Sequence, residues 1–335
     1  MPTTVRQIAK RSNVSPATVS RVLNNYPHVD EETRTAVMYV ASQLGYEIKS
    51  PRRTPRVSRS VLLLVRDDGI DTQDLAMTGK EFERSVSVAI HSVFEKHGIA
   101  TRLQRTRFAP DEVHTHTNDP GIAGLILLGG VINHDFVREL QKTDLPFVVV
   151  GAHIQPLEVN CVVADYLTGM EQAVTHVAQS GRKRIGMVNG PPTTSSSTEK
   201  YRGLRLALAT QELDWMPERL VACNFDAESG YAQTLELLKQ APDLDAIVFA
   251  DDTIAFGGLR ALKESGHRVP EDIAITGFYD LEIARFTDPP LTSVHFDIQA
   301  MGAIAAIRLC SLLKEPDKHP LFILMPTNLT IRQST

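Results

Sequence analysis

Apolar residues in the first 45 positions recur at helical spacing in three short stretches. The first begins after Thr4, and the second begins at Ser15-Pro16, where serine favours an N-cap and proline suits the first helical position. The third opens at Asp30 and ends at Gly45. Helices this short are not stable alone, so the pattern predicts a bundle packed through its apolar stripes. The stripes comprise Val5, Ile8 and Ala9, then Val19, Val22 and Leu23, then Val37, Val40, Ala41 and Leu44.

From residue 61 onward, short runs of valine, isoleucine and leucine alternate with amphipathic stretches. Continuous apolar runs with helical connections are typical of parallel sheets covered by helices on both faces. About 270 residues of such alternation exceed one doubly wound sheet, so we expect two lobes with a cleft between them. The strand-like runs lie at 61–65, 124–129, 147–151, 184–190, 246–251 and 273–278, and the helical stretches at 79–97, 166–180, 196–213, 226–240, 252–265 and 298–313.

The pattern therefore predicts an all-α head at 1–47, a linker at 48–60 and an α/β body with parallel doubly wound sheets at 61–335. The linker reads IKSPRRTPRVSRS, which is basic, contains two prolines and has no apolar period.

Charge is distributed unevenly between these parts. The whole chain has a net charge of −5, yet residues 1–60 contain ten basic and four acidic residues and carry +6. A basic head on an acidic body is typical of a protein whose head meets a polyanion. A basic terminus that is merely solvated would give the same imbalance.

The composition limits the class of protein. No run of about 18 apolar residues occurs, so no membrane span is expected. The N-terminus lacks the apolar stretch of a signal peptide, which favours a cytoplasmic protein. Cys161, Cys223 and Cys310 are far apart within apolar patterns, so we expect buried free thiols. His114 and His116 lie in a polar stretch without further ligands, and we expect solvated histidines there and neither a metal nor a cofactor.

The three helices of the head are suited to double-stranded DNA. In a helix-turn-helix, the N-terminal residues of the second helix meet base edges in the major groove. Arg21 could grip guanine O6 and N7, and Ala17 could contact a thymine methyl group. Short polar side chains nearby suit phosphate oxygens. The candidate DNA-binding residues of the head are Thr4, Ser15, Pro16, Ala17, Thr18, Ser20, Arg21 and Asn24.

The head resembles that of the LacI/GalR family of repressors. Threonine before an apolar helix, the pattern A-K-x-x-x-V-S-x-x-T-V-S-R-V-L-N, then V-x-x-x-T-R-x-x-V and L-G-Y all stand here at the family's spacing. By this resemblance Pro16, Ala17 and Arg21 occupy the main base-reading positions. The body continues the resemblance in VVADYLTGMEQAVTHVAQSGRKRIGMVNGP, in FADDTIAFGGLRALKESGHRVPEDIAITGFYD and in DPPLTSV.

The resemblance implies a transcriptional regulator, in most such proteins a repressor, that binds a palindromic operator as a homodimer. Its body would resemble periplasmic sugar-binding proteins and would bind a small-molecule effector, with a sugar or glycoside as the first expectation. Three chain crossings are expected near 161, 291 and 320. Lobe one would then hold about 61–161 and 292–320, and lobe two about 162–291 and 321–335.

Effector-contacting positions of the family map onto Lys200, Phe225, Asp251, Tyr279 and Phe296. An acidic acceptor, a cationic donor and aromatic plates suit a sugar ring. Phe225 and Phe296 could equally be core residues, and Asp252 is expected to cap the helix that follows it.

Several positions depart from the family. Lys200 replaces the usual arginine, Tyr279 the usual aspartate and Gly151 a common aspartate. Arg66 and Asp67 stand near the position of a missing N-P-F-F motif, and we expect them to contact the effector too. The missing aspartate argues against a purine effector.

The linker also departs from the family, because Pro55 stands where a hinge helix would carry a leucine wedge. Its arginines, Arg52, Arg53 and Arg56, could enter a narrow minor groove. A spacer whose charges add only non-specific attraction is an equal alternative.

Two other classes of protein share parts of this pattern. An extracellular solute-binding protein would have the same body, but not the basic head. A doubly wound enzyme fused to a DNA-binding domain would need a nucleophile–base set or a phosphate loop. GLILLGG and GPPTTSSST match neither G-x-G-x-x-G nor the lysine-bearing phosphate loop, and we expect no catalytic residues.

Overall fold

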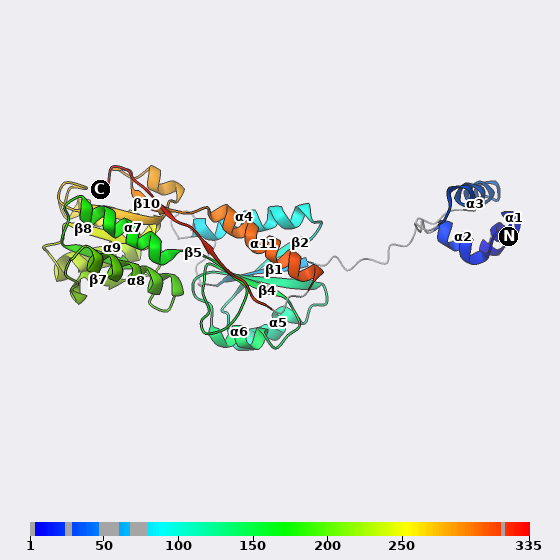
Figure 1. Cartoon of the computed structure of the whole chain (residues 1–335), viewed down its shortest axis with the longest axis horizontal. Coiled ribbons are helices and arrows are strands. Elements are labelled where there is room, and N and C mark those ends of the chain that lie inside the picture. Colours follow the sequence, from blue (N-terminus) through cyan, green and yellow to red (C-terminus); the bar gives the residue numbers. More distant parts are fainter. Residues whose placement is uncertain (1–3, 24–28, 47–59, 68–79, 316–318) are drawn as a thin grey trace. The chain divides into compact units, whose positions relative to one another are not determined.

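The computed structural model describes residues 4–23, 29–46, 60–67, 80–315 and 319–335 (Figure 1). The chain divides into two compact units, Met1–Ser58 and Arg59–Thr335. Asn24, Arg52, Arg53 and Arg56, four of the candidate DNA-binding residues, lie outside the described residues.

The first unit contains the three predicted helices, α1 (Val5–Arg11), α2 (Pro16–Leu23) and α3 (Glu31–Gln43). Each begins at the residue type that the sequence indicated. The Thr4 backbone N–H donates to Gln7 Oε1 over 2.8 Å, and the Asp30 carboxylate accepts from the Thr33 N–H at 2.8 Å. Gly45 ends the third helix with φ at +60°, which a residue without Cβ adopts without strain. The buried core of this unit comprises Ile8, Ala9, Val19, Val22, Val37 and Ala41.

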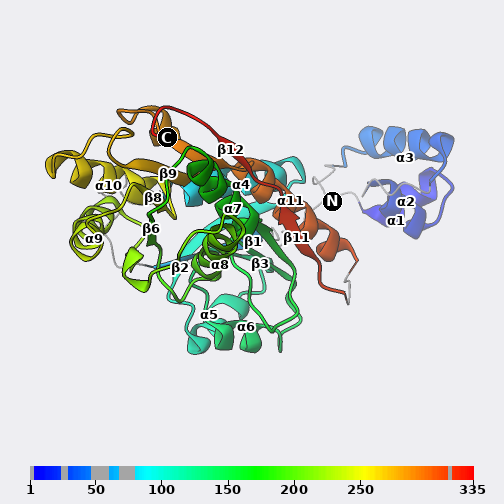
Figure 2. The same ribbon diagram turned by 60° about the vertical axis from the view of Figure 1, so that its left-hand side comes forward.

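The first lobe of the second unit is built on a six-stranded parallel sheet with strand order β11-β5-β4-β3-β1-β2. α4 and α11 pack together on one face of this sheet, and α5 and α6 cover the other (Figure 1, Figure 2). The strands are β1 (Ser60–Arg66), β2 (Ala100–Thr106), β3 (Ile122–Leu128), β4 (Phe147–Val150), β5 (Cys161–Ala164) and β11 (Phe322–Met325). The helices are α4 (Lys80–Lys96), α5 (Val113–Thr117), α6 (His134–Leu140) and α11 (Ile298–Lys314), with a 3-10 turn, η2, at Pro110–Glu112.

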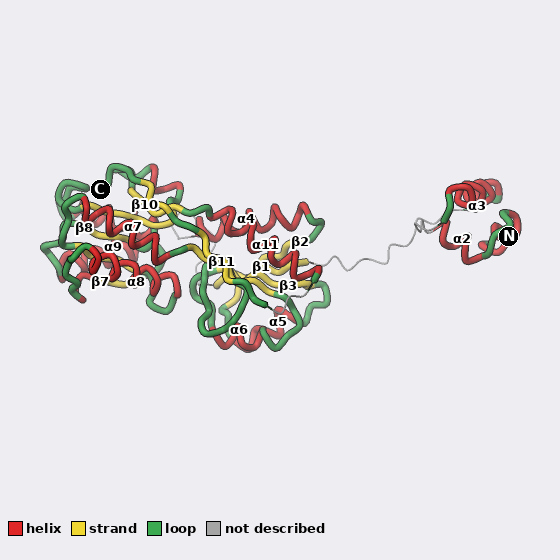
Figure 3. The backbone as a smooth tube through the Cα atoms, viewed as in Figure 1, coloured by secondary structure: helices red, strands yellow, loops and turns green. Residues whose placement is uncertain are grey.

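The second lobe has its own six-stranded sheet, with order β12-β10-β9-β8-β6-β7 and only β12 antiparallel. Figure 3 shows the helices of the chain in red and its strands in yellow. α7 packs alongside α8, and α9 alongside α10. The strands are β6 (Ile185–Asn189), β7 (Leu220–Ala222), β8 (Ala246–Phe249), β9 (Ala274–Tyr279), β10 (Thr292–His295) and β12 (Asn328–Thr330). The helices are α7 (Tyr166–Gln179), α8 (Ser195–Thr210), α9 (Ala227–Gln240) and α10 (Asp252–Glu264), with 3-10 turns η3 (Pro217–Arg219) and η4 (Glu282–Arg285).

The predicted fold class is therefore confirmed, and the six predicted helices of the body end within three residues of their expected bounds. The chain crosses between the sheets after β5, between β10 and α11, and between β11 and β12, which is a few residues later than expected each time. The difference arises at β5, β10 and β11, which are four-residue strands with too little pattern to show which sheet they join. Because β11 pairs with β5, residues 322–325 belong to the first lobe, although the sequence analysis placed them in the second.

Candidate functional site

α2 presents a polar and charged face because its apolar face is used for packing. Val19 and Val22 are buried, whereas Ser20 and Arg21 between them are exposed. Ser15 caps the helix by accepting the Thr18 N–H at 3.0 Å, and the two hydroxyl oxygens lie 2.8 Å apart. This cap satisfies one of the N–H groups at the start of the helix, at the point where base edges would be met.

The predicted DNA-contacting side chains of the first unit lie on its surface. Pro16, Ala17 and Arg21 are exposed along α2, and Thr4 is exposed at the start of α1. Thr18 is half-buried because its hydroxyl is paired with that of Ser15. The arrangement brings an arginine, a small apolar side chain and a serine hydroxyl to the exposed face of α2.

A cavity of about 580 Å³ lies between the two lobes of the second unit. It is bounded by the segments that follow the carboxyl ends of β1, β3 and β4 in the first lobe and of β6, β7, β8 and β9 in the second. Ligands of doubly wound sheets bind at these strand ends. Of the seven residues predicted to contact an effector, five line the cavity: Arg66, Asp67, Phe225, Asp251 and Tyr279.

The lobes touch around this cavity. The Phe82 ring of α4 lies 5.3 Å from the Tyr279 ring at the end of β9. The Tyr166 hydroxyl donates to the Gly151 carbonyl at 3.3 Å. At the rim, the His153 N–H donates to Ser195 Oγ over 2.9 Å. Contacts between residues so far apart in the chain hold a bounded cleft rather than an open groove.

Asp251 has two roles. It lines the cavity, and its carboxylate also caps α10 by accepting the Thr253 N–H at 2.6 Å. The side chain is 4% exposed, and this burial raises its pKa, against the opposing effect of the Lys200 charge. The oxygen lone pairs that remain can accept a ligand hydroxyl in a largely desolvated place, where a hydrogen bond is stronger than in water.

The expectation that Asp252 caps α10 is wrong, since the cap is Asp251. Asp252 is wholly buried and joins β9 and β10 to α10. Its two carboxylate oxygens accept the Ser293 hydroxyl at 2.6 Å and the Leu281 N–H at 2.7 Å. The lack of a side chain at Gly277 makes space for this carboxylate, because a Cβ there would lie 2.0 Å from it. Burial raises the pKa of Asp252 well above its usual value.

Lys200 does not line the cavity. Its side chain is fully buried, and its Nζ donates to the Ala250 carbonyl at 2.6 Å and to the Tyr279 hydroxyl at 3.3 Å. Nζ also lies 4.2 Å from the ring centroid of Phe278 and 5.0 Å from that of Tyr166. Burial lowers the pKa of Lys200 to about 7, against the pull of the neighbouring aspartates. The aromatic side chains enclose this cation and thereby take it away from a ligand.

Tyr279 covers Lys200 from the cavity side. It ends β9 with φ at +97°, a conformation that is strained for a residue with Cβ. Its ring packs against Phe82 and Phe296, with centroids 5.3 and 5.5 Å away. Burial raises the pKa of its phenol well above the usual value. Strain of this kind persists only where surrounding contacts hold it, and it is common at binding sites.

The two phenylalanines that were predicted to contact the effector lie in different places. Phe225 lines the cavity and passes over the backbone at Gly190, where a Cβ would lie 2.4 Å from its ring. Phe296 is 2% exposed, does not line the cavity and packs behind Tyr279.

Arg66 and Asp67 lie at the first-lobe side of the cavity. An Arg66 guanidinium N–H donates to the Val131 carbonyl at 3.2 Å, and the Arg66 carbonyl accepts from Arg105 at 3.0 Å. Val131 itself lines the cavity, so the arginine stays close to it.

Several polar and aromatic residues that line the cavity were not predicted from the sequence. Asn224 and Asp226 follow β7, which is only three residues long and gives no strand signal. Phe82 and Glu83 lie on α4, whose packing against the second lobe is a tertiary feature that periodicity does not carry. The lining residues missed in this way include Phe82, Glu83, Thr193, Ser196, Asn224 and Asp226.

The cysteines and His116, which were also considered from the sequence, are buried in the fold. All three cysteines are free and buried. His116 is 3% exposed on α5, and its Nε2 lies 3.2 Å from Thr106 Oγ1, so the expectation of a solvated loop histidine is wrong there. Across the described residues, no group of three or more His, Cys, Asp and Glu side chains could hold a metal ion. In the same part of the chain, no helix is long and apolar enough to cross a membrane.

Comparison with known proteins identifies both units. Residues 4–48 match the lacI family of bacterial regulatory proteins, and residues 174–335 match a periplasmic binding protein-like domain. The HTH-type transcriptional regulator MalR of Streptomyces coelicolor is 32% identical over 365 residues, covering 100% of this chain and 97% of MalR. The probable HTH-type transcriptional repressor ExuR of Bacillus subtilis is 28% identical over 337 residues, covering 99% and 98% of the two chains.

A solved structure is similar over the same length. The transcriptional regulator CelR in complex with cellobiose matches 99% of this chain and 100% of that chain, with a TM-score of 0.77 and 28% identity. The head, the two-lobed body and full-length similarity to regulators agree, and the chain belongs to the LacI family of bacterial transcription regulators.

Proposed function

We propose that this protein is a repressor that binds a palindromic operator as a homodimer and is controlled by a carbohydrate bound between the lobes of its second unit. The observation that carries the proposal is the cavity of about 580 Å³, lined by both lobes with aromatic rings and carboxylates. A cavity of this size and lining suits a small polyhydroxylated ligand.

The DNA-binding side of the proposal rests on α2. Exposed Arg21 provides a bidentate donor for guanine, and exposed Ala17 and Pro16 provide close apolar contact. Ser20, Ser15 and Thr4 would meet phosphate oxygens and fix the register. Asn24 and the linker residues Arg52, Arg53 and Arg56 lie outside the described residues, and their contacts with DNA stay predictions from the sequence.

The carbohydrate class is supported by chemistry and by similarity. Phe225 and Phe82 offer ring faces on which sugar C–H groups pack, and Asp251 offers a desolvated acceptor for hydroxyls. The similar CelR structure is described as a cellobiose complex. Lys200 and Phe296, which the resemblance placed at the ligand, would act from behind Tyr279 rather than by direct contact.

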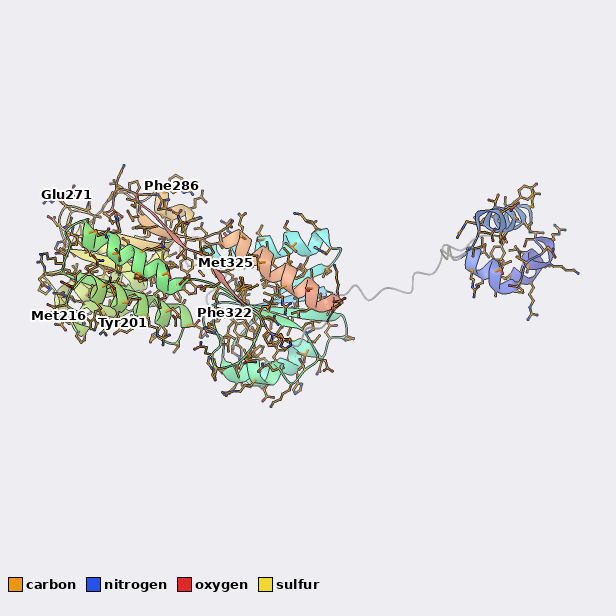
Figure 4. The ribbon with its side chains drawn as sticks, viewed as in Figure 1. Tyr201, Met216, Glu271, Phe286, Phe322 and Met325 are labelled. Carbon is orange, nitrogen blue, oxygen red and sulfur yellow. The ribbon has the colours of Figure 1, made fainter. Side chains whose placement is uncertain are left out.

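A homodimer is proposed because a palindromic operator presents two equivalent half-sites. β11 is a terminal strand of the first sheet, and its neighbouring apolar side chains Leu321, Phe322 and Leu324 are 44 to 50% exposed. Phe322 and Met325 mark the two ends of this strand (Figure 4).

Operator binding and reduced cysteines are both consistent with a cytoplasmic protein.

Binding-site selection with the full chain, followed by a thermal-shift screen of neutral mono- and disaccharides, tests the proposal. We expect a palindromic consensus and at least one sugar that raises the melting temperature, because a ligand bound only by the native state stabilises it. Selection that returns no consensus would contradict the DNA-binding role, and sugars without effect alongside an active ligand of another class would contradict the carbohydrate assignment.

A further inference from the structure

The charges that face the cavity are predominantly negative. Among the described lining residues, four carry carboxylates, Asp67, Glu83, Asp226 and Asp251, and one is a cation, Arg66. The Glu83 carboxylate lies 3.5 Å from the Arg105 guanidinium, and part of the Arg66 guanidinium donates to the Val131 carbonyl at 3.2 Å. A ligand between the lobes would therefore meet more carboxylates than cationic groups.

Helix N-termini are the second source of positive potential at this cavity. α8, α9 and α10 begin beside it, and the free N–H groups of a helix start attract anions. At α9 and α10 the cap is an aspartate: Asp226 accepts the Ser229 N–H at 2.7 Å, and Asp251 accepts the Thr253 N–H at 2.6 Å. At α8 the cap is the neutral hydroxyl of Thr194. Two of these three helix starts thus place a carboxylate beside the ligand.

Lys200 is the third source, and it is withdrawn. Its Nζ donates to the Ala250 carbonyl and the Tyr279 hydroxyl, and the Tyr279 ring centroid is 4.3 Å away. Because Tyr279 lines the cavity and Lys200 does not, the phenol separates the cation from a ligand.

From these three observations we infer that the effector carries no anionic group and binds chiefly as a hydrogen-bond donor, as a neutral hydroxyl-rich sugar does. The inference rests on the proposed carbohydrate site and narrows its ligand. An amino sugar is tolerated, whereas a uronic acid or sugar phosphate would place its charge beside carboxylates in the space between the lobes. Such juxtaposition of like charges weakens binding strongly.

Calorimetry with the full chain at constant ionic strength tests the inference on matched sets. Each set contains a neutral sugar, its 2-amino form, its uronic acid and its 6-phosphate, with the glucose and galactose series as the first two. We expect the neutral member of an active set to bind at least about tenfold more tightly than its uronic acid or phosphate. Tighter binding of an anionic member than of its neutral counterpart would overturn the inference.

A charge variant gives a second readout. Asp226→Asn keeps an N-cap residue at the start of α9 but removes one carboxylate from the cavity, so the affinity ratio of neutral sugar to uronic acid should fall several-fold. Asp297→Asn is the matched control, because Asp297 caps α11 by accepting the Ala300 N–H at 2.7 Å and does not line the cavity. An unchanged ratio in Asp226→Asn would contradict the inference.

The ligand class and its charge can fail separately. If sugars are silent and adenosine binds, the carbohydrate assignment fails, and the charge preference is then judged on adenosine against adenosine monophosphate. Tighter binding of the monophosphate would overturn the charge inference as well, whereas tighter binding of adenosine would uphold it.

Discussion

The two units of this chain place their functional residues in opposite environments. In the first unit, a small apolar core of short helices holds Arg21, Ala17 and Ser20 in solvent. In the second, Asp251, Asp252 and Lys200 are buried, and each is hydrogen-bonded to the backbone or to a neighbouring side chain at or behind the wall of the cavity. Exposed residues act through what they reach, whereas buried ones act through what surrounds them, so the same substitution should have different consequences in the two units.

The largest effect is expected at Asp252. Replacing it by alanine leaves the Ser293 hydroxyl and the Leu281 N–H without their buried acceptor. We expect Asp252→Ala to lower the free energy of unfolding of the second unit by about 3 kcal/mol. Ser293→Ala removes the hydroxyl that donates to Asp252 and accepts the Asp280 N–H at 3.1 Å, but it leaves the Asp252 bond to Leu281, and it should lower the free energy of unfolding by about 1 kcal/mol. Denaturant unfolding measures both, and an Asp252→Ala loss no larger than that of Ser293→Ala would show that the buried carboxylate is not the structural hub described.

Arg21 is an exposed residue of the first unit, and its replacement should affect DNA binding rather than stability. Because the side chain is exposed, Arg21→Ala should leave stability unchanged but weaken binding to the preferred operator by about 1–3 kcal/mol. Preference should also relax at one symmetric base pair of each half-site. Arg11→Ala removes a charge from exposed α1 and should weaken all sequences alike. Site selection that returns the wild-type consensus for Arg21→Ala would remove Arg21 from base reading.

The buried Lys200 should make the free energy of unfolding depend on pH. Its folded-state pKa is lowered to about 7 from the usual 10.5, so the unfolded chain holds the proton more tightly between these values. The free energy of unfolding should therefore rise with pH in this window, relative to Lys200→Met, by up to about 1.4 kcal/mol per pH unit. Asp251 and Asp252 are present in both proteins. Lys239→Met is the control, at a side chain that is 75% exposed. The difference in free energy of unfolding between wild type and Lys239→Met should not change with pH in this window. Parallel stability curves for wild type and Lys200→Met from pH 7 to 9 would contradict the burial of this charge.

The smallest effect on stability separates the two roles of Asp251. Loss of the cap in Asp251→Ala should lower the free energy of unfolding by about 1 kcal/mol, whereas Asp251→Asn keeps a capping residue and should be nearly neutral. Both variants should weaken effector binding by about tenfold or more, because a charged acceptor is lost. Asp297→Ala loses a comparable cap away from the cavity and should keep wild-type effector affinity. Wild-type affinity in Asp251→Asn would remove Asp251 from the site.

The sequence predicted the first unit more completely than the cavity. Ser15, Asp30 and Gly45 mark helix ends through local chemistry, and the apolar stripes determine which face of α2 remains exposed. The body's long apolar runs likewise predicted its parallel sheets. The roles of Asp251 and Asp252 could not be separated in this way, because adjacent aspartates after a strand look alike until β9 and β10 are placed beside one of them.

Lys200 illustrates the same limit. A lysine at a family ligand position suggests a donor for the effector, but whether Tyr279 lies between that lysine and the ligand depends on a strained backbone at φ +97°. Residue types near a cavity can be read from sequence, whereas desolvation and order of layers arise only from tertiary packing. The short strands β5, β7, β10 and β11 were missed for a related reason, since three or four residues carry little periodicity.

We propose above all that a sugar bound in the cavity changes the affinity of the first unit for DNA. The direct test of this claim is the fluorescence anisotropy of a labelled operator that has been obtained by site selection. The operator is titrated with the protein in the absence and presence of a saturating neutral sugar identified by calorimetry. We expect the sugar to change the operator dissociation constant at least about fivefold. At the same sugar concentration, we expect a smaller change for Asp251→Asn, because this variant binds the sugar more weakly. Saturating sugar bound to the wild type with an unchanged operator dissociation constant would contradict the claim.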